Sequence, residues 1–245
     1  MTDLTGIYYT SNQNSDYFMA NTQRILLENF GDNPIISVSF KPTVIGNNCT
    51  NIVIGEQQRS NYMLYKQVLI GVRAATTKYV CMLEDDMLYS KEHFQYRPED
   101  GIFAYNTNKW SIFSWKKPPI FSQRIRKLMN SLIVTREALL KTLEERYSKY
   151  PVLEEVPGRL IKYFWGEPGR FEDHLGINKL KTEEYYSSVP NIMFSTSEAL
   201  GYLHLGERKK HSGILKEEVE PWGSAEAVLK LYAKVQNERA NSFKK

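Results

Sequence analysis

The chain has 245 residues, of which 42% are hydrophobic, and a formal net charge of +4, so it can bury one sizeable core and we expect one main domain. Its longest apolar runs, residues 35–40 and 79–83, are far shorter than the roughly 20 residues of a membrane-spanning helix. Residues 1–6 also lack the basic start and apolar stretch of a secretory signal, so we expect a cytoplasmic protein with no integral membrane association.

The first two predicted elements are a strand and a helix. Residues 4–10 are rich in β-forming side chains and end at a polar loop, which predicts a strand. In residues 16–29 the apolar side chains recur at helical spacing, with Ser15 or Asp16 as the N-cap and Gly31 just past the end. A helix therefore follows the first strand directly.

The same alternation continues to about residue 83. Residues 34–40 form a near-continuous apolar run, which is typical of a strand covered on both faces of a parallel sheet. After a short apolar run at 52–55, residues 60–75 group their apolar side chains on one side and predict a helix. Residues 79–83 predict the next strand. This order predicts an α/β fold with a doubly wound, mostly parallel sheet flanked by helices.

The second half of the chain is predicted to be less regular. Short strands are predicted at 101–105 and 110–115, an amphipathic helix at 134–147 and a last helix at about 224–237. We expect a main domain over residues 1–220, with a donor-binding half and an acceptor-binding half, followed by a C-terminal helix and tail; the expected ranges are 1–100, 101–220 and 221–245. The two cysteines, Cys49 and Cys81, are too few for a disulfide scaffold or a cysteine-rich zinc site.

Three adjacent carboxylates, Glu84-Asp85-Asp86, follow the third predicted strand. In open α/β sheets, ligands bind outside the carboxyl ends of the strands. Three neighbouring carboxylates repel one another and favour a compensating cation, and carboxylate oxygens are preferred ligands of Mg²⁺ and Mn²⁺. A metal-bridged diphosphate fits this position. The alternative is that the motif only begins a solvated loop and caps a helix starting near Ser90.

Residues 4–136 resemble the GT-A fold of nucleotide-sugar glycosyltransferases, in which an acidic motif ends the strand after the nucleotide-binding helix and is spelled Glu-Asp-Asp in some members. The resemblance implies that Asp86 binds a divalent metal, Mn²⁺ or Mg²⁺, and that Glu84 and Asp85 contact ribose or metal-bound water. It also implies that the end of the first strand and the start of the second helix bind the nucleotide of a UDP-sugar, through Tyr9, Thr10, Ser11, Asn12 and Arg59.

A second acidic segment, residues 169–175, resembles the motif that begins a helix beside the acceptor in this family. The resemblance implies that Asp173 is the general base that deprotonates the acceptor hydroxyl, with Glu172 assisting. The alternative is a pair of carboxylates that merely caps an ordinary helix.

Two late histidines, His204 and His211, occupy the region where the family often has a histidine that completes the metal shell. We favour His211 as the metal ligand, because His204 lies within an apolar alternation typical of a core histidine.

The segment from residue 101 to residue 136 contains no acidic residue and mixes cations with aromatic rings. Such a mixture suits a phosphate backbone and unstacked bases, so we expect it to bind the acceptor. The predicted acceptor residues are Lys109, Trp110, Trp115, Lys116, Lys117, Arg124, Arg126 and Lys127. Two alternatives stay open: the rings pack in the core while the lysines form a solvated face, or the segment attracts anionic lipids.

The chain is also similar to small bacteriophage glycosyltransferases in three segments, which begin at Glu84, Phe103 and Pro221. This resemblance implies transfer of a hexose from a UDP-sugar to 5-hydroxymethylcytosine in DNA, in the host cytoplasm. Synthesis of a surface polysaccharide or lipid-linked glycan is an alternative, and so is a non-catalytic nucleotide-sugar or DNA-binding module. No glycine-rich phosphate loop follows the first strand, which disfavours a nucleotidyltransferase. The oligomeric state stays open.

Overall fold

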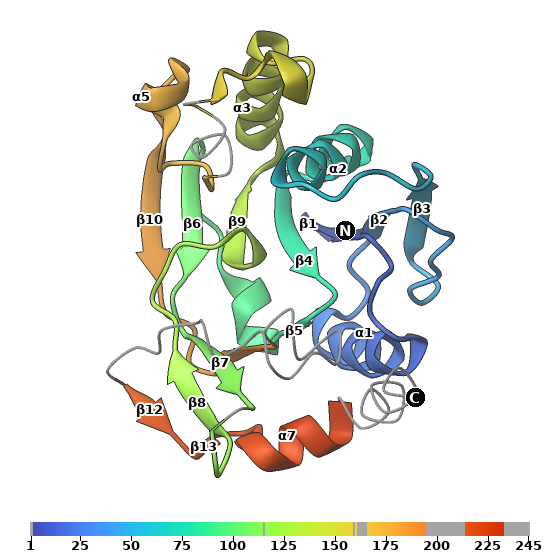
Figure 1. Cartoon of the computed structure of the whole chain (residues 1–245), viewed down its shortest axis with the longest axis vertical. Coiled ribbons are helices and arrows are strands. Elements are labelled where there is room, and N and C mark those ends of the chain that lie inside the picture. The colour runs from blue at the N-terminus through green and yellow to red at the C-terminus, as the bar shows by residue number, and fades with distance from the viewer. Residues whose placement is uncertain (1, 115, 159, 161–165, 195–213, 233–245) are drawn as a thin grey trace.

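The computed structural model describes residues 2–114, 116–158, 160, 166–194 and 214–232. Its main sheet has seven strands in the order β10-β6-β9-β4-β1-β2-β3 (Figure 1). In chain order these strands are β1 (Leu4–Thr10), β2 (Ile35–Ser39), β3 (Cys49–Val53), β4 (Tyr79–Glu84), β6 (Ile102–Asn106), β9 (Leu132–Thr135) and β10 (Lys181–Tyr185).

All neighbouring pairs in this sheet are parallel except those made by β9, which runs antiparallel to both β4 and β6. The register of β1 on β4 places Tyr9 opposite Glu84, so the ends of both strands meet at one edge. Because β9 runs in reverse, the 3-10 helix η2 (Met129–Ser131) that precedes it reaches the same edge.

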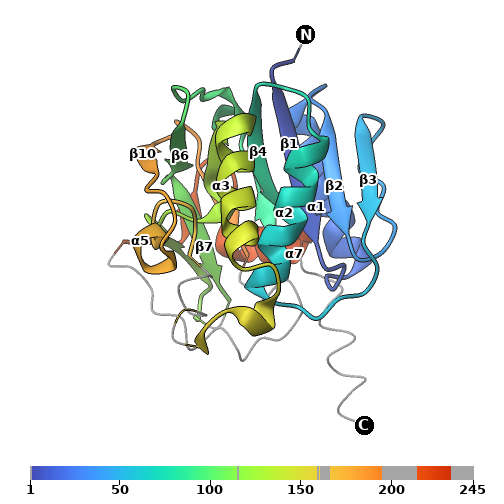
Figure 2. The same ribbon diagram turned by 90° about the horizontal axis from the view of Figure 1, so that it is seen from above.

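Helices cover both faces of the main sheet. Helices α2 (Asn61–Ala74) and α3 (Arg136–Lys149) lie side by side over one face, while α1 (Asp16–Phe30) covers the other (Figures 1 and 2). The apolar side chains of α2 and α3 join one core cluster and those of α1 join another. The predicted α/β class, with a doubly wound and mostly parallel sheet, is therefore confirmed.

Serine caps begin the first two helices, as the sequence predicted for α1. Ser15 Oγ accepts a hydrogen bond from Phe18 N at 3.2 Å, and Ser60 Oγ accepts one from Met63 N at 3.0 Å. Gly31 ends α1 with a φ of 64° while its N–H bonds Leu27 O, a conformation that favours glycine.

A second sheet of five strands lies beside the first, in the order β12-β8-β7-β11-β5. It packs with α1 and with α7 (Ala225–Tyr232) around a separate core cluster. Its strands are β5 (Met87–Leu88), β7 (Lys109–Phe113), β8 (Ile120–Gln123), β11 (Asn191–Met193) and β12 (Leu215–Lys216). The remaining short elements are η1 (Lys91–Gln95), η3 (Leu153–Glu155), α5 (Glu172–Leu175), β13 (Glu218–Val219) and β14 (Gly223–Ser224).

The helix predicted from residue 134 begins later, at Arg136. Val134 and Thr135 belong instead to β9, where they pair with Val80 and Tyr79. Both are β-branched and buried, so the sheet takes them. The last helix is described over Ala225–Tyr232, and the rest of its predicted range lies outside the described residues. Within the described part of the chain, no helix has the length and apolar character needed to cross a membrane.

Candidate nucleotide-sugar site

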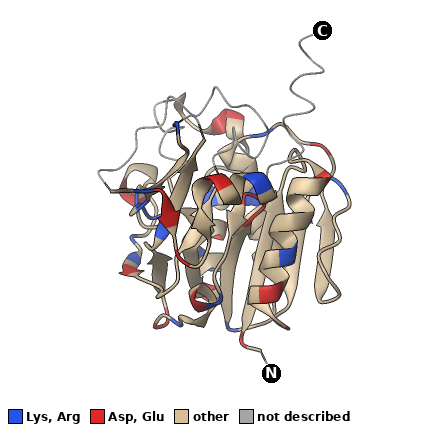
Figure 3. Ribbon diagram, turned by 90° about the horizontal axis from the view of Figure 1, so that it is seen from below, with Lys and Arg blue, Asp and Glu red and all other residues tan. Residues whose placement is uncertain are grey.

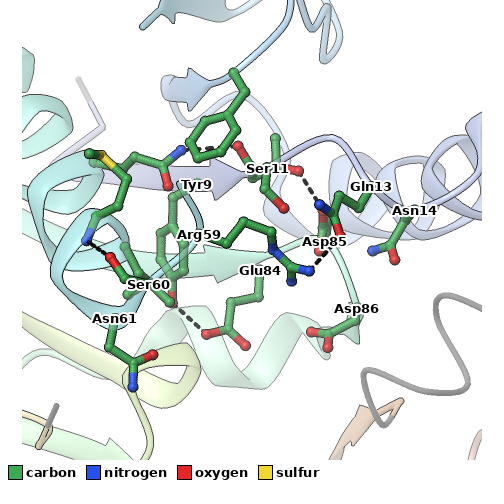
Figure 4. Close-up of a pocket in the computed structure, with 15 residues that line it drawn as sticks. Tyr9, Ser11, Gln13, Asn14, Arg59, Ser60, Asn61, Glu84, Asp85 and Asp86 are labelled. Carbon is green, nitrogen blue, oxygen red and sulfur yellow. Dashed lines mark hydrogen bonds between the residues drawn. The ribbon is translucent and has the colours of Figure 1, made fainter. Parts of the chain in front are cut away.

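A cavity of about 420 Å³ opens at the carboxyl ends of β1 and β4, beside the amino end of α2 (Figure 4). It brings together most of the residues that the sequence assigned to the nucleotide sugar. The lining residues are Tyr9, Thr10, Ser11, Gln13, Asn14, Phe40, Arg59, Ser60, Asn61, Met63, Leu64, Gln67, Glu84, Asp85 and Asp86. The location is where an α/β sheet binds ligands.

Glu84 is held by two donors. Tyr9 Oη donates to Glu84 Oε1 at 2.7 Å, and Asn130 Nδ2, from η2, donates to Glu84 Oε2 at 2.7 Å. Burial raises the pKa of Glu84, and these two hydrogen bonds oppose that rise. Both carboxylate oxygens of Glu84 therefore accept hydrogen bonds from within the protein, so this side chain supports the structure of the site.

Asp85 is a partly buried carboxylate beside Glu84. Its Oδ2 accepts a 2.5 Å hydrogen bond from Thr10 Oγ1, at the end of β1. Burial raises the pKa of Asp85 to about 6; the Thr10 hydrogen bond lowers it, and the charge of Glu84 adds to the rise. A nearby cation would stabilise the ionised form of this group.

Asp86 stands at the turn between β4 and β5, and its side chain lines the cavity (Figure 4). Its backbone carbonyl accepts a hydrogen bond from Phe194 N at 2.9 Å, which ties the turn to the end of β11. Among the described residues no three His, Cys, Asp or Glu side chains are grouped to hold a metal ion. The adjacent carboxylates of Asp85 and Asp86 nevertheless fit Mg²⁺ or Mn²⁺, since such ions often take one or two carboxylates together with substrate phosphates.

Arg59 lies at the rim of the cavity, just before α2, and donates a hydrogen bond to Gln13 Oε1 across the opening. Asn12 does not line the cavity, although the sequence placed it in the base pocket. Its Nδ2 donates to Thr43 Oγ1 at 2.7 Å and its Oδ1 accepts from Lys41 N, so its side chain orders the loop after β2. Its φ of 54° turns the chain at this point.

The two carboxylates predicted for catalysis have different surroundings. Glu172 is buried, 3.6 Å from Arg146 Nη2, and its Oε1 accepts from Gly169 N at 2.9 Å. Asp173 is 62% exposed and pairs with Lys179 at 3.0 Å. Leu175 of α5 belongs to the same core cluster as Tyr62 in the first turn of α2, and Tyr150 connects them, since Tyr62 Oη donates to Tyr150 O and Tyr150 Oη donates to Leu175 O.

Two residues predicted to bind the acceptor are buried instead. Lys109 is 0% exposed, and its Nζ donates to Arg126 O at 2.7 Å and to Ser131 Oγ at 2.9 Å. Trp110 is 4% exposed and belongs to the core of the second sheet. Trp110 is covered by the core that the second sheet shares with α1 and α7, and Lys109 is enclosed by the segment after β8 and by η2, so these two acceptor assignments are wrong.

The other predicted cations differ in accessibility. Lys117 and Arg126 are exposed, whereas Lys116, Arg124 and Lys127 are partly buried. Arg124 Nε donates to Ser111 Oγ and its guanidinium lies over the Phe113 ring, while Lys127 Nζ donates to Thr182 Oγ1. Figure 3 shows that Lys and Arg residues are interspersed with Asp and Glu residues along the ribbon. Trp115, His204 and His211 lie outside the described residues.

Several lining residues were not predicted from the sequence. Three of them, Gln13, Asn14 and Asn61, lie in the same polar segments as the predicted residues. Their closeness in sequence to those residues could have identified them. Gln67 lies in the middle of α2, a position that attracts no attention in the sequence. The same holds for Asn130 in η2, which bonds Glu84 without lining the cavity. Glu167 is a further carboxylate near the site, because its charge adds to the burial that raises the pKa of Glu84.

Neither a protein-family model nor a curated protein sequence matches this chain. Three solved structures that share part of the fold are described as transferases. A nucleotidyl transferase from Methanothermobacter thermautotroptrophicus is 11% identical with a TM-score of 0.43, over 78% of this chain and 89% of that chain. The apo glycosyltransferase GlyE of Streptococcus pneumoniae TIGR4 is 8% identical with a TM-score of 0.46, over 75% of this chain and 46% of that chain.

A third similar structure is a glycosyltransferase involved in the glycosylation of the major capsid of PBCV-1. It is 11% identical with a TM-score of 0.44, over 82% of this chain and 99% of that chain. These low identities and TM-scores describe a partial likeness of fold.

Proposed function

We propose that this protein is a glycosyltransferase that moves a sugar from a nucleotide sugar, a UDP-hexose, to a hydroxyl group. The cavity at the ends of β1 and β4 is the observation that carries the proposal. It combines apolar side chains suited to a base, from Phe40, Met63 and Leu64, with an acidic end suited to a metal-bound diphosphate, at Asp85 and Asp86. A nucleotide sugar has both chemical parts in one molecule.

Each carboxylate of the motif has its own proposed role. Asp86 binds the divalent ion, Mn²⁺ or Mg²⁺, and Asp85 contacts the ribose or metal-bound water. Glu84 holds β1, β4 and η2 together through Tyr9 and Asn130. When bound, the ion would neutralise the diphosphate charge and so stabilise the leaving group. His211 remains the proposed additional ligand.

Asp173 is proposed to accept the proton of the acceptor hydroxyl. Its side chain is exposed, so a substrate can reach it, and Leu175 of the same short helix shares a core cluster with Tyr62 of α2. Glu172 acts indirectly, because its contacts with Arg146 and Gly169 fix the loop that carries Asp173. The proton therefore passes to Asp173 while Glu172 stays in its internal pair.

For the acceptor we propose 5-hydroxymethylcytosine in DNA. The support is the run from residue 101 to residue 136, which has no acidic residue and exposes Lys117 and Arg126. The exposed apolar side chain of Ile125 lies next to Arg126 in the chain and offers an apolar contact surface beside the cations.

The test is sugar transfer measured by mass spectrometry of nucleosides. Incubation with UDP-glucose, Mn²⁺ and hydroxymethylated DNA should add one hexose to 5-hydroxymethylcytosine, and unmodified DNA is the matched control. Transfer to a lipid-linked acceptor but not to DNA would overturn the acceptor and keep the enzyme. Nucleotide-sugar binding without transfer or hydrolysis of any donor in a panel would indicate a non-catalytic module and overturn the proposal.

A further inference from the structure

Gln67 occupies an unusual position for a polar side chain in the middle of a helix. It lies on α2, is only 4% exposed, and points at the junction of β1 and β2. Its Nε2 donates to Thr10 O at 3.0 Å and to Val38 O at 2.8 Å. Both amide N–H groups are thus used by backbone carbonyls.

This pairing fixes the direction of the amide. If nitrogen and oxygen were exchanged, the Gln67 oxygen would face two carbonyl oxygens, which also only accept hydrogen bonds. Gln67 Oε1 therefore has a single orientation, and none of the hydrogen bonds within the described residues ends on it. Because Gln67 lines the cavity, this oxygen is an acceptor available to a ligand there.

The surroundings of Gln67 in the cavity suit a flat heterocycle. Phe40, Met63 and Leu64 supply apolar surface, and the donors at the same cavity include the Ser11 hydroxyl and the guanidinium of Arg59. A fixed acceptor in partly apolar surroundings rejects a ligand that places a lone pair against it, because that lone pair loses its water and gains no donor.

We propose that Gln67 determines which base the donor carries, by accepting a hydrogen bond from the N3–H group of uracil. This inference rests on the proposed nucleotide-sugar donor. Uracil presents N3–H between two carbonyl oxygens, a pattern complementary to an acceptor accompanied by hydroxyl and guanidinium donors. Cytosine has an unprotonated N3 at the same place, so its lone pair would face the Gln67 oxygen.

The experiment is calorimetric titration of the whole chain, in the presence of Mn²⁺, with UDP, CDP and 3-methyluridine diphosphate. Wild type should bind UDP at least about 10-fold more tightly than the other two, the value of one hydrogen bond. Gln67→Met should bind UDP about 10-fold more weakly and lose the preference. Gln57→Met is the matched control, because Gln57 is exposed and, among the described residues, its side chain bonds only Ile54 O.

Two failures can be told apart. If wild type binds UDP and CDP equally, or binds 3-methyluridine diphosphate as tightly as UDP, the role of Gln67 is overturned while the donor site stands. If no nucleoside diphosphate in a panel that includes ADP and GDP binds, the proposed function fails as well. Thermal melting of Gln67→Met checks the fold, and the comparison of UDP with its 3-methyl analogue on wild type needs no variant.

Discussion

The hydroxyl of Tyr9 donates a 2.7 Å hydrogen bond to Glu84 Oε1, and this contact joins the end of β1 to the end of β4. Tyr9→Phe should destabilise the protein by about 1–3 kcal/mol, because a partly buried carboxylate loses one of its two side-chain donors. Urea unfolding at pH 7 measures the change. Tyr17→Phe is the control, since Tyr17 is exposed, and equal stabilities of the two variants would contradict the supporting role of Tyr9.

Asp86→Ala should abolish most sugar transfer while the fold is retained. If Asp86 binds the metal that stabilises the diphosphate, the rate should fall by about two orders of magnitude or more. Asp100→Ala is a suitable control, because Asp100 is exposed and its salt bridge is with Lys78, which precedes β4 and so lies at the opposite end of that strand. A fully active Asp86→Ala variant with an unchanged Mn²⁺ requirement would refute the metal role.

Metal-assisted donor binding should depend on pH through Asp85. Burial raises the pKa of Asp85 to about 6, so the group is largely protonated below that pH and ionised above it. The gain in UDP-glucose affinity on adding Mn²⁺ should therefore increase as pH rises from 5 to 7, with a midpoint near 6, because the diphosphate of a nucleotide sugar has no group of its own that titrates in this range. Calorimetry with and without Mn²⁺ measures this gain. In Asp85→Asn the pH dependence should disappear, and its persistence there would assign it to another group.

Lys109 should make the unfolding free energy depend on pH on the alkaline side. Burial lowers its pKa from 10.5 to about 7, so between these values the unfolded chain binds more protons than the folded one. Stability should then rise from pH 7 to pH 9 by about 1 kcal/mol per pH unit. Denaturant unfolding at both pH values tests this, and Lys109→Met should have a flatter profile. Lys117→Met, at an exposed position, should keep the slope of wild type.

Adjacent carboxylates in α5 should give opposite results. Glu172→Gln should lower stability by about 3 kcal/mol, because the buried guanidinium of Arg146 loses its charged partner. Asp173→Asn should leave thermal melting nearly unchanged, since its pair with Lys179 is exposed, yet reduce kcat by about 100-fold or more. The donor KM of Asp173→Asn should not change. An Asp173→Asn enzyme with normal kcat would show that another group accepts the proton.

The first half of the fold follows from local chemistry. The apolar runs at β1, β2 and β4 are buried on both faces of a parallel sheet, and serine caps begin α1 and α2. The predicted start of the helix α3 was wrong, because the spacing of neighbouring apolar residues did not show where the preceding strand ends. Val134 continues the apolar spacing of α3, but pairing with Val80 places it in a strand. Such pairing joins segments more than 50 residues apart, so helical spacing alone could not reveal it.

The site was predictable where polar residues interrupt an apolar strand, as at Glu84–Asp86, or follow one, as at Ser11. Burial was the missing information elsewhere. Lys109 and Trp110 have the composition of an acceptor surface, yet Lys109 bonds Arg126 and Ser131 internally and Trp110 lies in the core of the second sheet. Gln67 could not be identified either, because its role depends on carbonyls of β1 and β2 that only the folded sheet brings to it.

The reversed direction of β9 connects the carboxyl end of β4 to the second sheet. Because β9 runs antiparallel to β4, the residues before β9 lie at the sheet edge where β4 ends. Asn130 is one of these residues, and it bonds Glu84 there. The next residue, Ser131, accepts from Lys109 on the second sheet. Lys109 of β7 is therefore linked through two consecutive residues, Ser131 and Asn130, to the carboxylate of Glu84. The second sheet and the carboxyl end of β4 are held in register by this short chain of hydrogen bonds.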